Sequence, residues 1–473
     1  MQLAEGFKRK CLPLPVQKLK LFLKENGFGF YNHRLSTCSK TLSFSGKKRM
    51  IQALKFISPA RLTKPETILY FLISGFFVTL FFAKLTSFNV GFTAALVLYS
   101  FRFSAMQEKS EAFKNRKHVW FMLLFFAFLL ISFLFSENKT TGLHHLKIRL
   151  PLLLFPVSLG LLNITKELKN KVLLTFAGLT TLIGALCLAY SIYLYTQTGR
   201  ADIFYNDNLT LILKQQSIYV ALLVNFAIFI FGYFILFTTQ PKKGWMTLAV
   251  LFLFVISYLL ASRINLAVLA LVSLAAGAYY IFKGKKILEG IALIFGLVMA
   301  VFAIYKFQPT SFNRFKELAI TQFDYENQGK DAHFNVALEA DQWNGANFRL
   351  AAWNCGWEVF KENAISGTGI GDKDDALREK YGEKNFHFAL KHDRNVHNNY
   401  LDILFSLGLV GFTLFLLGWV VLPLAKAFTL RDGLAFVIIL TIAVAWITEV
   451  YFSRNFGTMI VSFFIPFLLA GRK

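Results

Sequence analysis

The chain has 473 residues, of which 55% are hydrophobic and 16% are charged, and this composition excludes an ordinary soluble protein. Its net charge of +24 would suit nucleic-acid binding, but the excess Lys and Arg lie in the first 65 residues and in short segments between apolar runs. That distribution is typical of the cytosolic side of a membrane protein, with possible contact to anionic lipids. We therefore predict a polytopic α-helical membrane protein.

Residues 1–65 carry 14 Lys and Arg against only Glu5 and Glu25, and they show no sustained periodicity. We predict a basic cytosolic tail. The sequence from Met50 onward would also make a normal start for a membrane protein, so we expect the first 49 residues to be dispensable. The four cysteines have no paired spacing, which predicts neither a disulfide framework nor a zinc site.

Apolar runs recur along nearly the whole chain, and a bilayer-spanning helix needs about 20 such residues. We predict about twelve transmembrane helices, at residues 67–84, 87–101, 118–136, 147–163, 172–196, 217–238, 245–261, 264–282, 287–305, 400–423, 433–451 and 456–471. With the basic tail inside, the loops 102–117, 164–171, 239–244, 283–286 and 424–432 fall in the cytosol, and every one is basic. Both termini are then expected to be cytosolic.

The segment 306–396 is the only long hydrophilic stretch between spans, and its 12 Lys and Arg nearly balance 14 Asp and Glu. Within it, NFRLAAWNCGWEVF has helical spacing of its large residues, and the glycines of SGTGIGD are expected to end that helix. We divide the chain into the tail 1–65, transmembrane helices 1–9 in 66–305, the large outer loop 306–396 with short helices, and helices 10–12 with the C-terminus in 397–473.

Arg263 is a single cation between two apolar runs, in LLASRINLAVLAL. Ionisable groups beside hydrocarbon are functional candidates, although an Arg that reaches the lipid headgroups would explain the same sequence.

The simpler explanation of Arg349 is a solvated arginine in a loop. Its case improves because Trp353 follows one helical turn later, which gives an amphipathic helix able to lie on the membrane with Arg349 at the interface.

His397 stands where the chain re-enters lipid, in RNVHNNYLDIL. A helix there would place His397 and Tyr400 on one face. Asn398 could cap the helix or hydrogen-bond a polar ligand. Imidazole titrates near neutral pH, so a histidine at a membrane boundary can act as a general base. A purely structural interfacial histidine is the competing interpretation.

Other candidates have weaker sequence support. Arg149 opens the fourth span on its outer side and could contact phosphate or lipid headgroups. Glu449 and Arg454 bracket the turn between the last two spans, where pairing with each other is the simple explanation. The pair His144-His145 lacks further ligands at metal-binding spacing. The glycines at 367, 369 and 371 lack the strand–turn–helix context of a nucleotide loop.

The three best candidates, Arg263, Arg349 and His397, all fall on the outer side by the charge-based topology. Two fixed cations and a base suit glycosyl transfer from a lipid diphosphate. Arginine neutralises the developing charge of the leaving group, and histidine takes the proton of the attacking hydroxyl. We expect arginine to do this in place of a metal ion, with no cofactor.

Three motifs in this order, SRINLAVL, FRLAAW…GTGIG and HNNYLDILFSLGLVGFTLFL, resemble the O-antigen ligase and O-antigen polymerase superfamily. The ending EVYFSRNFG resembles a C-terminal pattern found in part of that group. The resemblance covers about residues 65–471, and the HNxYL block followed by GLxG is its most specific part. One departure is the start of the sixth span, where many relatives have a His-Pro-type entry and this chain has QQSIYVAL, so Gln216 cannot be a base.

The resemblance implies an all-α C-type glycosyltransferase in the bacterial inner membrane, with the outer loop in the periplasm and the active site at the periplasmic face. It implies an undecaprenyl-diphosphate-linked glycan as donor and inverting, metal-independent chemistry. By matching position, His397 would activate the acceptor. Arg263 and Arg349, with Arg149, would bind the diphosphate, supported by Asn398, Tyr400, Trp353, Glu449 and Arg454.

Ligase and polymerase share these motifs and differ in acceptor. We favour a ligase that joins O-antigen to lipid A-core or another periplasmic acceptor, and keep a polymerase and a protein O-oligosaccharyltransferase as alternatives. From a different class, a flippase or exporter of lipid-linked sugar would place charges at mid-membrane depth, whereas here they collect at the outer boundary. The sequence does not specify the sugar, the acceptor or the oligomeric state.

Overall fold

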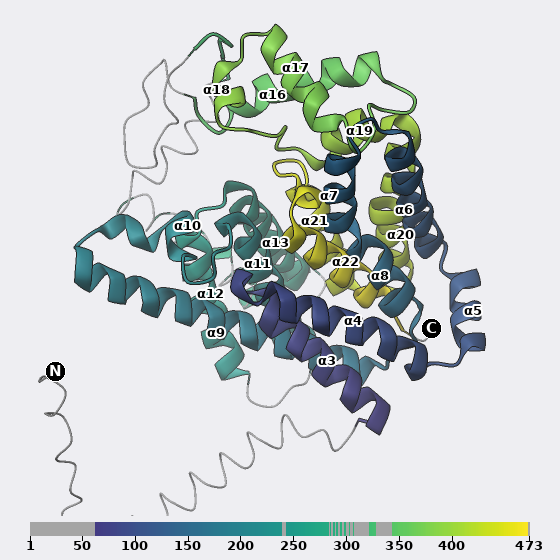
Figure 1. Cartoon of the computed structure of the whole chain (residues 1–473). Helices are drawn as coiled ribbons and strands as arrows, with labels where there is room; N and C mark the ends of the chain where they lie inside the picture. Colours follow the sequence, from purple (N-terminus) through teal and green to yellow (C-terminus); the bar gives the residue numbers. More distant parts are fainter. Residues whose placement is uncertain are drawn as a thin grey trace, which may run out of the picture. The chain divides into compact units, whose positions relative to one another are not determined.

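The computed structural model describes residues 62–238, 243–282, 321–327 and 343–471, with isolated positions between 284 and 306. The tail with Met50, most of the predicted span 287–305 and most of 307–342 lie outside the described residues. Across the described residues the regular elements are helices (Figure 1), which confirms the all-α class.

The first half of the described chain contains α3 (Lys64–Leu80), α4 (Thr86–Phe103), α5 (Met106–Asn115), α6 (Lys117–Phe135), α7 (Lys139–Arg149), α8 (Pro151–Ser158), α9 (Lys166–Thr198), α10 (Asn206–Leu209), α11 (Ser217–Phe237), α12 (Gly244–Leu259) and α13 (Arg263–Phe282). The second half contains α16 (Asn347–Glu362), α17 (Lys373–Glu383), α18 (His387–Lys391), α19 (Asn399–Phe415), α20 (Leu422–Thr429), α21 (Gly433–Ala445) and α22 (Asn455–Leu469). A π-helical turn, Leu416–Val421, joins α19 to α20.

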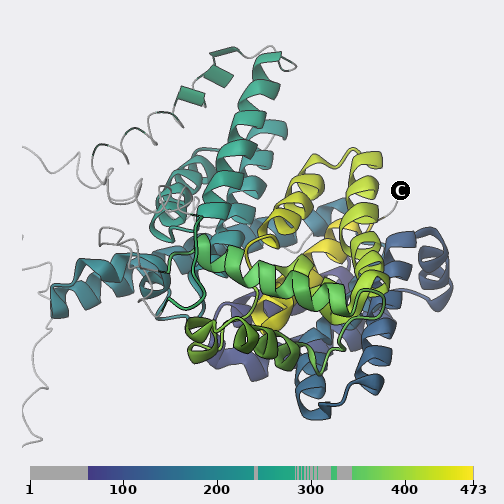
Figure 2. The ribbon, with the colours of Figure 1, turned by 90° about the horizontal axis from the view of Figure 1, so that it is seen from above.

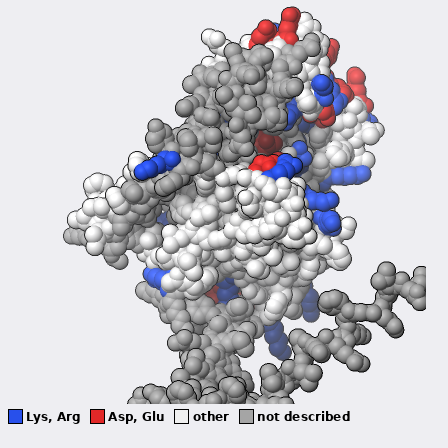
Figure 3. Space-filling model, turned by 90° about the vertical axis from the view of Figure 1, so that its left-hand side faces the viewer, with Lys and Arg blue, Asp and Glu red and all other residues white. Residues whose placement is uncertain are grey.

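Four helices in the described part of the chain are long and apolar enough to cross a membrane, namely Lys117–Phe135, Lys166–Thr198, Ser217–Phe237 and Asn399–Thr429. Shorter apolar helices lie at Gly244–Leu259, Arg263–Tyr279, Gly433–Ala445 and Asn455–Leu469. On the face in Figure 3, a wide uncharged surface separates charged side chains above it from Lys and Arg below it. The protein is therefore a multi-pass membrane protein, and the count of twelve spans stays a prediction.

The segments predicted to be cytosolic meet at one end of the described structure. The Arg116 guanidinium, just before α6, donates to the carbonyl oxygens of Gly160 (2.6 Å), Leu162 (2.9 Å) and Gly471 (3.2 Å). Lys169 of α9 likewise donates to the carbonyl of Leu468 at 2.6 Å. These cations satisfy carbonyls that helix ends leave unpaired, so they join four segments of the chain at this end.

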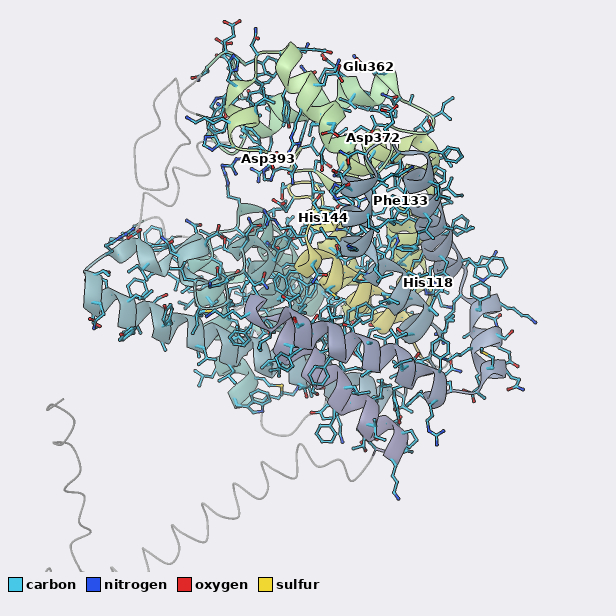
Figure 4. The ribbon with its side chains drawn as sticks, viewed as in Figure 1. His118, Phe133, His144, Glu362, Asp372 and Asp393 are labelled. Carbon is cyan, nitrogen blue, oxygen red and sulfur yellow. The ribbon has the colours of Figure 1, made fainter. Side chains whose placement is uncertain are left out.

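Segments predicted to lie outside meet one another in the same way. Asp372, in the loop before α17, accepts hydrogen bonds from the backbone amides of Glu137 (2.9 Å) and Asn138 (2.7 Å). Figure 4 shows Asp372 near Phe133, at one end of α6, and His118 at the other end of that helix. The grouping agrees with the predicted alternation, and the assignment of this end to the periplasm stays a prediction.

Residues 343–396 fold into a small helical subdomain with its own apolar core. Trp343 packs against Phe386 and Phe388, with ring centroids 4.8 and 5.7 Å apart, and Val396 and Leu401 continue the core into α19. Figures 1 and 2 show this green segment at one end of the bundle, over the C-terminal helices. The predicted helix at NFRLAAWNCGWEVF is confirmed as α16.

The backbone of α19 breaks at Gly408, whose φ of 62° and ψ of −169° are not helical. The loop between α16 and α17 fills the break: the amides of Thr368 and Gly369 donate to the carbonyls of Phe405 (2.9 Å) and Ser406 (3.0 Å). Gly367 (φ 74°) and Gly369 (φ 100°) adopt the left-handed region here. The glycine-rich loop therefore supplies the hydrogen bonds that the broken membrane helix lacks.

Two sequence predictions of local structure were wrong. The expected outer loop 137–146 is helical as part of α7, because the Asn138 side chain caps its first turn, and Pro151 starts the separate helix α8. The predicted span 433–451 ends early, since α21 stops at Ala445. The turn that follows it reaches back to the start of α19, where the Trp446 carbonyl accepts the Asn399 amide at 2.8 Å.

Candidate active site

His397 and Glu449 form a hydrogen-bonded pair, with His397 Nδ1 3.0 Å from Glu449 Oε2. The histidine side chain is 20% exposed and the carboxylate 8% exposed. A carboxylate can only accept, so Nδ1 carries the proton and the lone pair lies on Nε2. Nε2 is then the ring nitrogen that can accept a proton from a substrate hydroxyl.

Burial would raise the pKa of Glu449, but the hydrogen bond from His397 and the positive charges of Arg349 and Arg454 together lower it. The carboxylate is therefore ionised at neutral pH. Glu449 was predicted to pair with Arg454. In the structure its hydrogen-bond partner is His397. The two residues are 52 positions apart in the sequence, so the sequence alone does not reveal that they pair.

The backbone of His397 lies just before α19 and not on it, so the prediction that it shares a helical face with Tyr400 was wrong. His397 has φ 47°, a left-handed conformation that is uncommon outside glycine. The Asn395 side chain holds it by accepting the His397 amide at 2.9 Å, and the Phe348 ring packs edge-on against the imidazole. Asn398 does cap α19, as predicted, by accepting the Leu401 amide at 3.1 Å.

Arg349 projects from the first turn of α16 toward the same turn that carries Glu449. Its Nε donates to the Thr448 carbonyl at 3.2 Å, and its Nη1 donates to the Gly345 carbonyl at 2.5 Å. The pKa of Arg349 is lowered to about 10, chiefly by burial and also by the charges of Arg263 and Arg394, while Glu449 acts in the opposite direction. Arg349 is thus positively charged at neutral pH, and Glu449 offsets only part of that charge.

Arg263 comes to the same place from the other half of the chain. A Cβ built on Gly345 would lie 2.4 Å from Arg263 Nη2 and 3.1 Å from Arg349 Nη1. Gly345 therefore separates two guanidinium groups, and any side chain there would displace one of them. Two guanidinium groups this close together are chemically suited to an anion such as a phosphate.

The start of α13, which carries Arg263, is fixed from within the bundle. The buried Asn265 side chain donates to the Ile218 carbonyl (3.1 Å) and to Ser262 Oγ (2.8 Å). Asn225 of α11 in turn donates to the Asn265 carbonyl at 2.8 Å. A short turn separates the end of α12 at Leu259 from Arg263, and this amide network sets its position against α11.

Arg149 has an environment other than the one predicted. Its side chain is fully buried, with Nη2 3.0 Å from Asp402 Oδ2 and Nε 3.3 Å from the Phe452 carbonyl. Lys373 of α17 binds the other oxygen of Asp402 at 2.6 Å. This burial contradicts a contact between Arg149 and a diphosphate, because no phosphate oxygen can reach a side chain with 0% exposure. Its role here is to bind Asp402 beneath the site.

Two other predicted supporting residues pack around the site. The Tyr400 hydroxyl donates to the Ala443 carbonyl at 2.7 Å, which fixes α19 against α21. Trp353 packs against the core of the 343–396 subdomain. Both side chains orient the elements that carry His397 and Arg349.

The segment before and at the start of α17 contains an Asp-x-Asp pattern, Asp372 and Asp374, of a kind that can bind a divalent ion. The structure uses both carboxylates for other contacts: Asp372 binds the start of α7, and Asp374 contacts His145 Nε2 at 2.8 Å and Lys373 Nζ at 3.3 Å. Despite burial, Lys373 and His145 lower the pKa of Asp374. No group of three or more His, Cys, Asp or Glu positioned to hold a metal ion occurs among the described residues.

Comparison with known proteins gives a family match for part of the chain. No curated protein matches the chain. Residues 226–416 match the family model described as O-antigen ligase, and the matched region contains Arg263, Arg349 and His397. This match supports the O-antigen ligase superfamily, which the motifs of the chain resemble.

Proposed function

We propose that this protein is an O-antigen ligase that transfers a glycan from undecaprenyl diphosphate to a hydroxyl of lipid A-core at the periplasmic face of the inner membrane. The observation that carries the proposal is the convergence of Arg263 and Arg349 on Gly345, beside the His397–Glu449 pair. Anion binding and proton removal are thereby combined at one boundary of the membrane helices.

His397 Nε2 removes the proton from the acceptor hydroxyl as its oxygen attacks the anomeric carbon of the donor. The bond between that carbon and the diphosphate oxygen breaks in the same displacement, which inverts the anomeric configuration. The imidazolium that forms is stabilised by Glu449 at 3.0 Å. The proton is then released to water, and undecaprenyl diphosphate is the second product.

The leaving diphosphate gains negative charge as the bond breaks. Arg263 and Arg349 supply permanent positive charge and planar donor groups for this purpose. Both are held before substrate arrives, Arg349 by two backbone carbonyls and Arg263 by the anchored start of α13. Preorganised donors of this kind reduce the reorganisation that the transition state requires.

Two alternatives in the same superfamily differ only in the acceptor. A polymerase would use a second lipid-linked glycan, and a protein O-oligosaccharyltransferase would use a side-chain hydroxyl. A flippase would need no base, so the His397–Glu449 pair favours transfer chemistry over transport.

A deletion strain separates these functions. Loss of a ligase leaves long glycan chains on the lipid carrier, whereas loss of a polymerase leaves single repeat units on it. We expect long carrier-linked chains, restored to the surface by the wild-type gene and by Arg378→Ala, an exposed arginine of the same subdomain, but not by Arg263→Ala or His397→Ala. Single repeat units would identify a polymerase. Normal surface glycan in the deletion strain would reject the proposal.

A further inference from the structure

A second polar cleft opens beside the proposed catalytic pair, at the end of the bundle that sequence analysis places outside. Its volume is about 340 Å³, within the range of small-molecule sites. Three segments that are distant in sequence line it: the α3–α4 connection, the entry to α11, and the entry to α22. Arg263, Arg349 and His397 are not among its lining residues, so the cleft is distinct from the diphosphate position.

The entry to α11 supplies three polar side chains to the cleft, those of Lys214, Gln215 and Gln216. Its backbone is fixed, because the Leu213 carbonyl accepts the Ala83 amide at 3.0 Å and Thr210 Oγ1 donates to the Gln215 carbonyl at 2.6 Å. Sequence analysis assigned no role to Gln216. Its amide is instead suited to paired hydrogen bonds with sugar hydroxyls.

The lining also contains a buried hydroxyl, Ser453 Oγ, that has no hydrogen-bond partner among the described residues. A buried hydroxyl without a partner is unfavourable, so Ser453 is suited to a polar ligand that enters the cleft. The buried hydroxyl of Tyr219 instead interacts with Glu449. Arg454 and Asn455 complete the polar side.

The cleft also adjoins the catalytic pair. The ring of Tyr219 packs against Tyr451 at 4.9 Å between centroids, two residues after Glu449. Tyr219 lies within the electrostatic influence of both Glu449 and Arg454, and Arg454 acts on Glu449 as well. The cleft therefore adjoins the turn that carries Glu449, the carboxylate partner of His397.

We propose that this cleft binds the acceptor through a sugar unit that carries an anionic group, a phosphate or carboxylate. Gln215, Gln216 and Asn455 pair with its hydroxyls, Lys214 and Arg454 neutralise its charge, and a neighbouring hydroxyl is presented to His397. The inference rests on the proposed function for the identity of the acceptor, but binding to the cleft can be measured without any transfer.

The test uses full-length protein in phosphatidylcholine nanodiscs without donor, titrated calorimetrically with phosphorylated lipid A-core oligosaccharide. We expect Gln216→Ala and Lys214→Met each to weaken binding about tenfold, and phosphatase treatment of the oligosaccharide to do the same to wild-type protein. Lys84→Met, an exposed lysine near the cleft but outside its lining, should bind as wild type does.

Unchanged binding in both cleft variants would overturn the assignment. Displacement of the oligosaccharide by added phosphatidylglycerol would show a phospholipid site and would also overturn it. If His397→Ala abolishes transfer while binding survives, both proposals stand. If binding behaves as expected but His397→Ala and Arg263→Ala transfer normally, only the proposed mechanism fails.

Discussion

At the scale of single residues, the site depends on residues that set the tautomer or the position of the side chains proposed to act on substrate. Glu449 sets the tautomer of His397, and Gly345 leaves room for two guanidinium groups. The sequence did not predict these roles for Glu449 or Gly345, because candidates were chosen from it by the chemistry of each side chain alone. A glycine has no chemistry of its own, and the partner of a histidine 52 residues away is determined only by the folded turn.

Glu449→Gln should lower the turnover number at least about 100-fold, because a neutral amide no longer fixes the His397 tautomer or stabilises the imidazolium. The measurement is initial transfer rate at saturating substrate, with the exposed Glu383→Gln as control. A rate within threefold of wild type, roughly, would contradict the paired role.

The same substitution has a predicted effect on acid stability. The folded pKa of Glu449 lies below its ordinary value of about 4.5, so its contribution to stability is present above that pH and is lost as pH falls through the folded pKa. Glu449→Gln should therefore be less stable than wild type at neutral pH, and the difference should shrink below about pH 4.5. Detergent-phase thermal unfolding across pH measures it.

Gly345→Ala should displace one guanidinium group, since its Cβ would lie 2.4 Å from Arg263 Nη2. We expect transfer efficiency, kcat/KM for the donor, to fall about tenfold or more, with little change in thermal stability. Gly382→Ala in the exposed part of α17, where a Cβ meets nothing within 4 Å, is the matched control. Equal activity of the two variants would show that Arg263 and Arg349 do not act together at Gly345.

At the scale of elements, α19 carries most of what positions the site. Its first turn joins His397 to the α21–α22 turn, its break at Gly408 receives the glycine-rich loop, and Asp402 binds α7 and α17. The broken helix thus connects the 343–396 subdomain to the membrane helices at its first turn, at Asp402 and at Gly408.

Gly408→Ala should destabilise the protein by at least about 1–3 kcal/mol, because its backbone conformation is accessible essentially to glycine alone. A Cβ there would also lie 2.2 Å from the Ile365 carbonyl oxygen. Thermal unfolding of the detergent-solubilised protein measures the loss. Gly232→Ala in α11, which meets nothing within 4 Å, should be neutral or stabilising. Unfolding of both variants at the same temperature would contradict the assigned conformation.

Asp402→Ala should cost about 3–5 kcal/mol, because it leaves the buried cations Arg149 and Lys373 without their shared carboxylate. The pair of Lys380 and Glu383, in which the carboxylate is exposed, offers a comparison in which Glu383→Ala should cost less than about 1 kcal/mol. Denaturant unfolding in a fixed detergent gives both values. A loss in Asp402→Ala no larger than in Glu383→Ala would contradict a structural role for this network.

At the scale of the whole molecule, composition and charge pattern were enough to predict an all-helical membrane protein and the grouping of its loops at two ends. The same reasoning brought Arg263, Arg349 and His397 to one side, because topology depends on sums over many residues. The local backbone geometry could not be predicted from the sequence in the same way. The break in α19 and the helical start of α7 each depend on contacts made by another segment, namely residues 364–372 and the capping side chain of Asn138.

The central claim is that Arg263, Arg349 and His397 form one site for glycosyl transfer. Its most direct test is transfer from a purified lipid-diphosphate-linked glycan to lipid A-core by full-length protein in vesicles, followed by release of carrier diphosphate. We predict that Arg263→Ala, Arg349→Ala and His397→Ala each reduce the rate at least about 100-fold, whereas Arg378→Ala retains it. Wild-type rates in Arg263→Ala and His397→Ala would contradict the account.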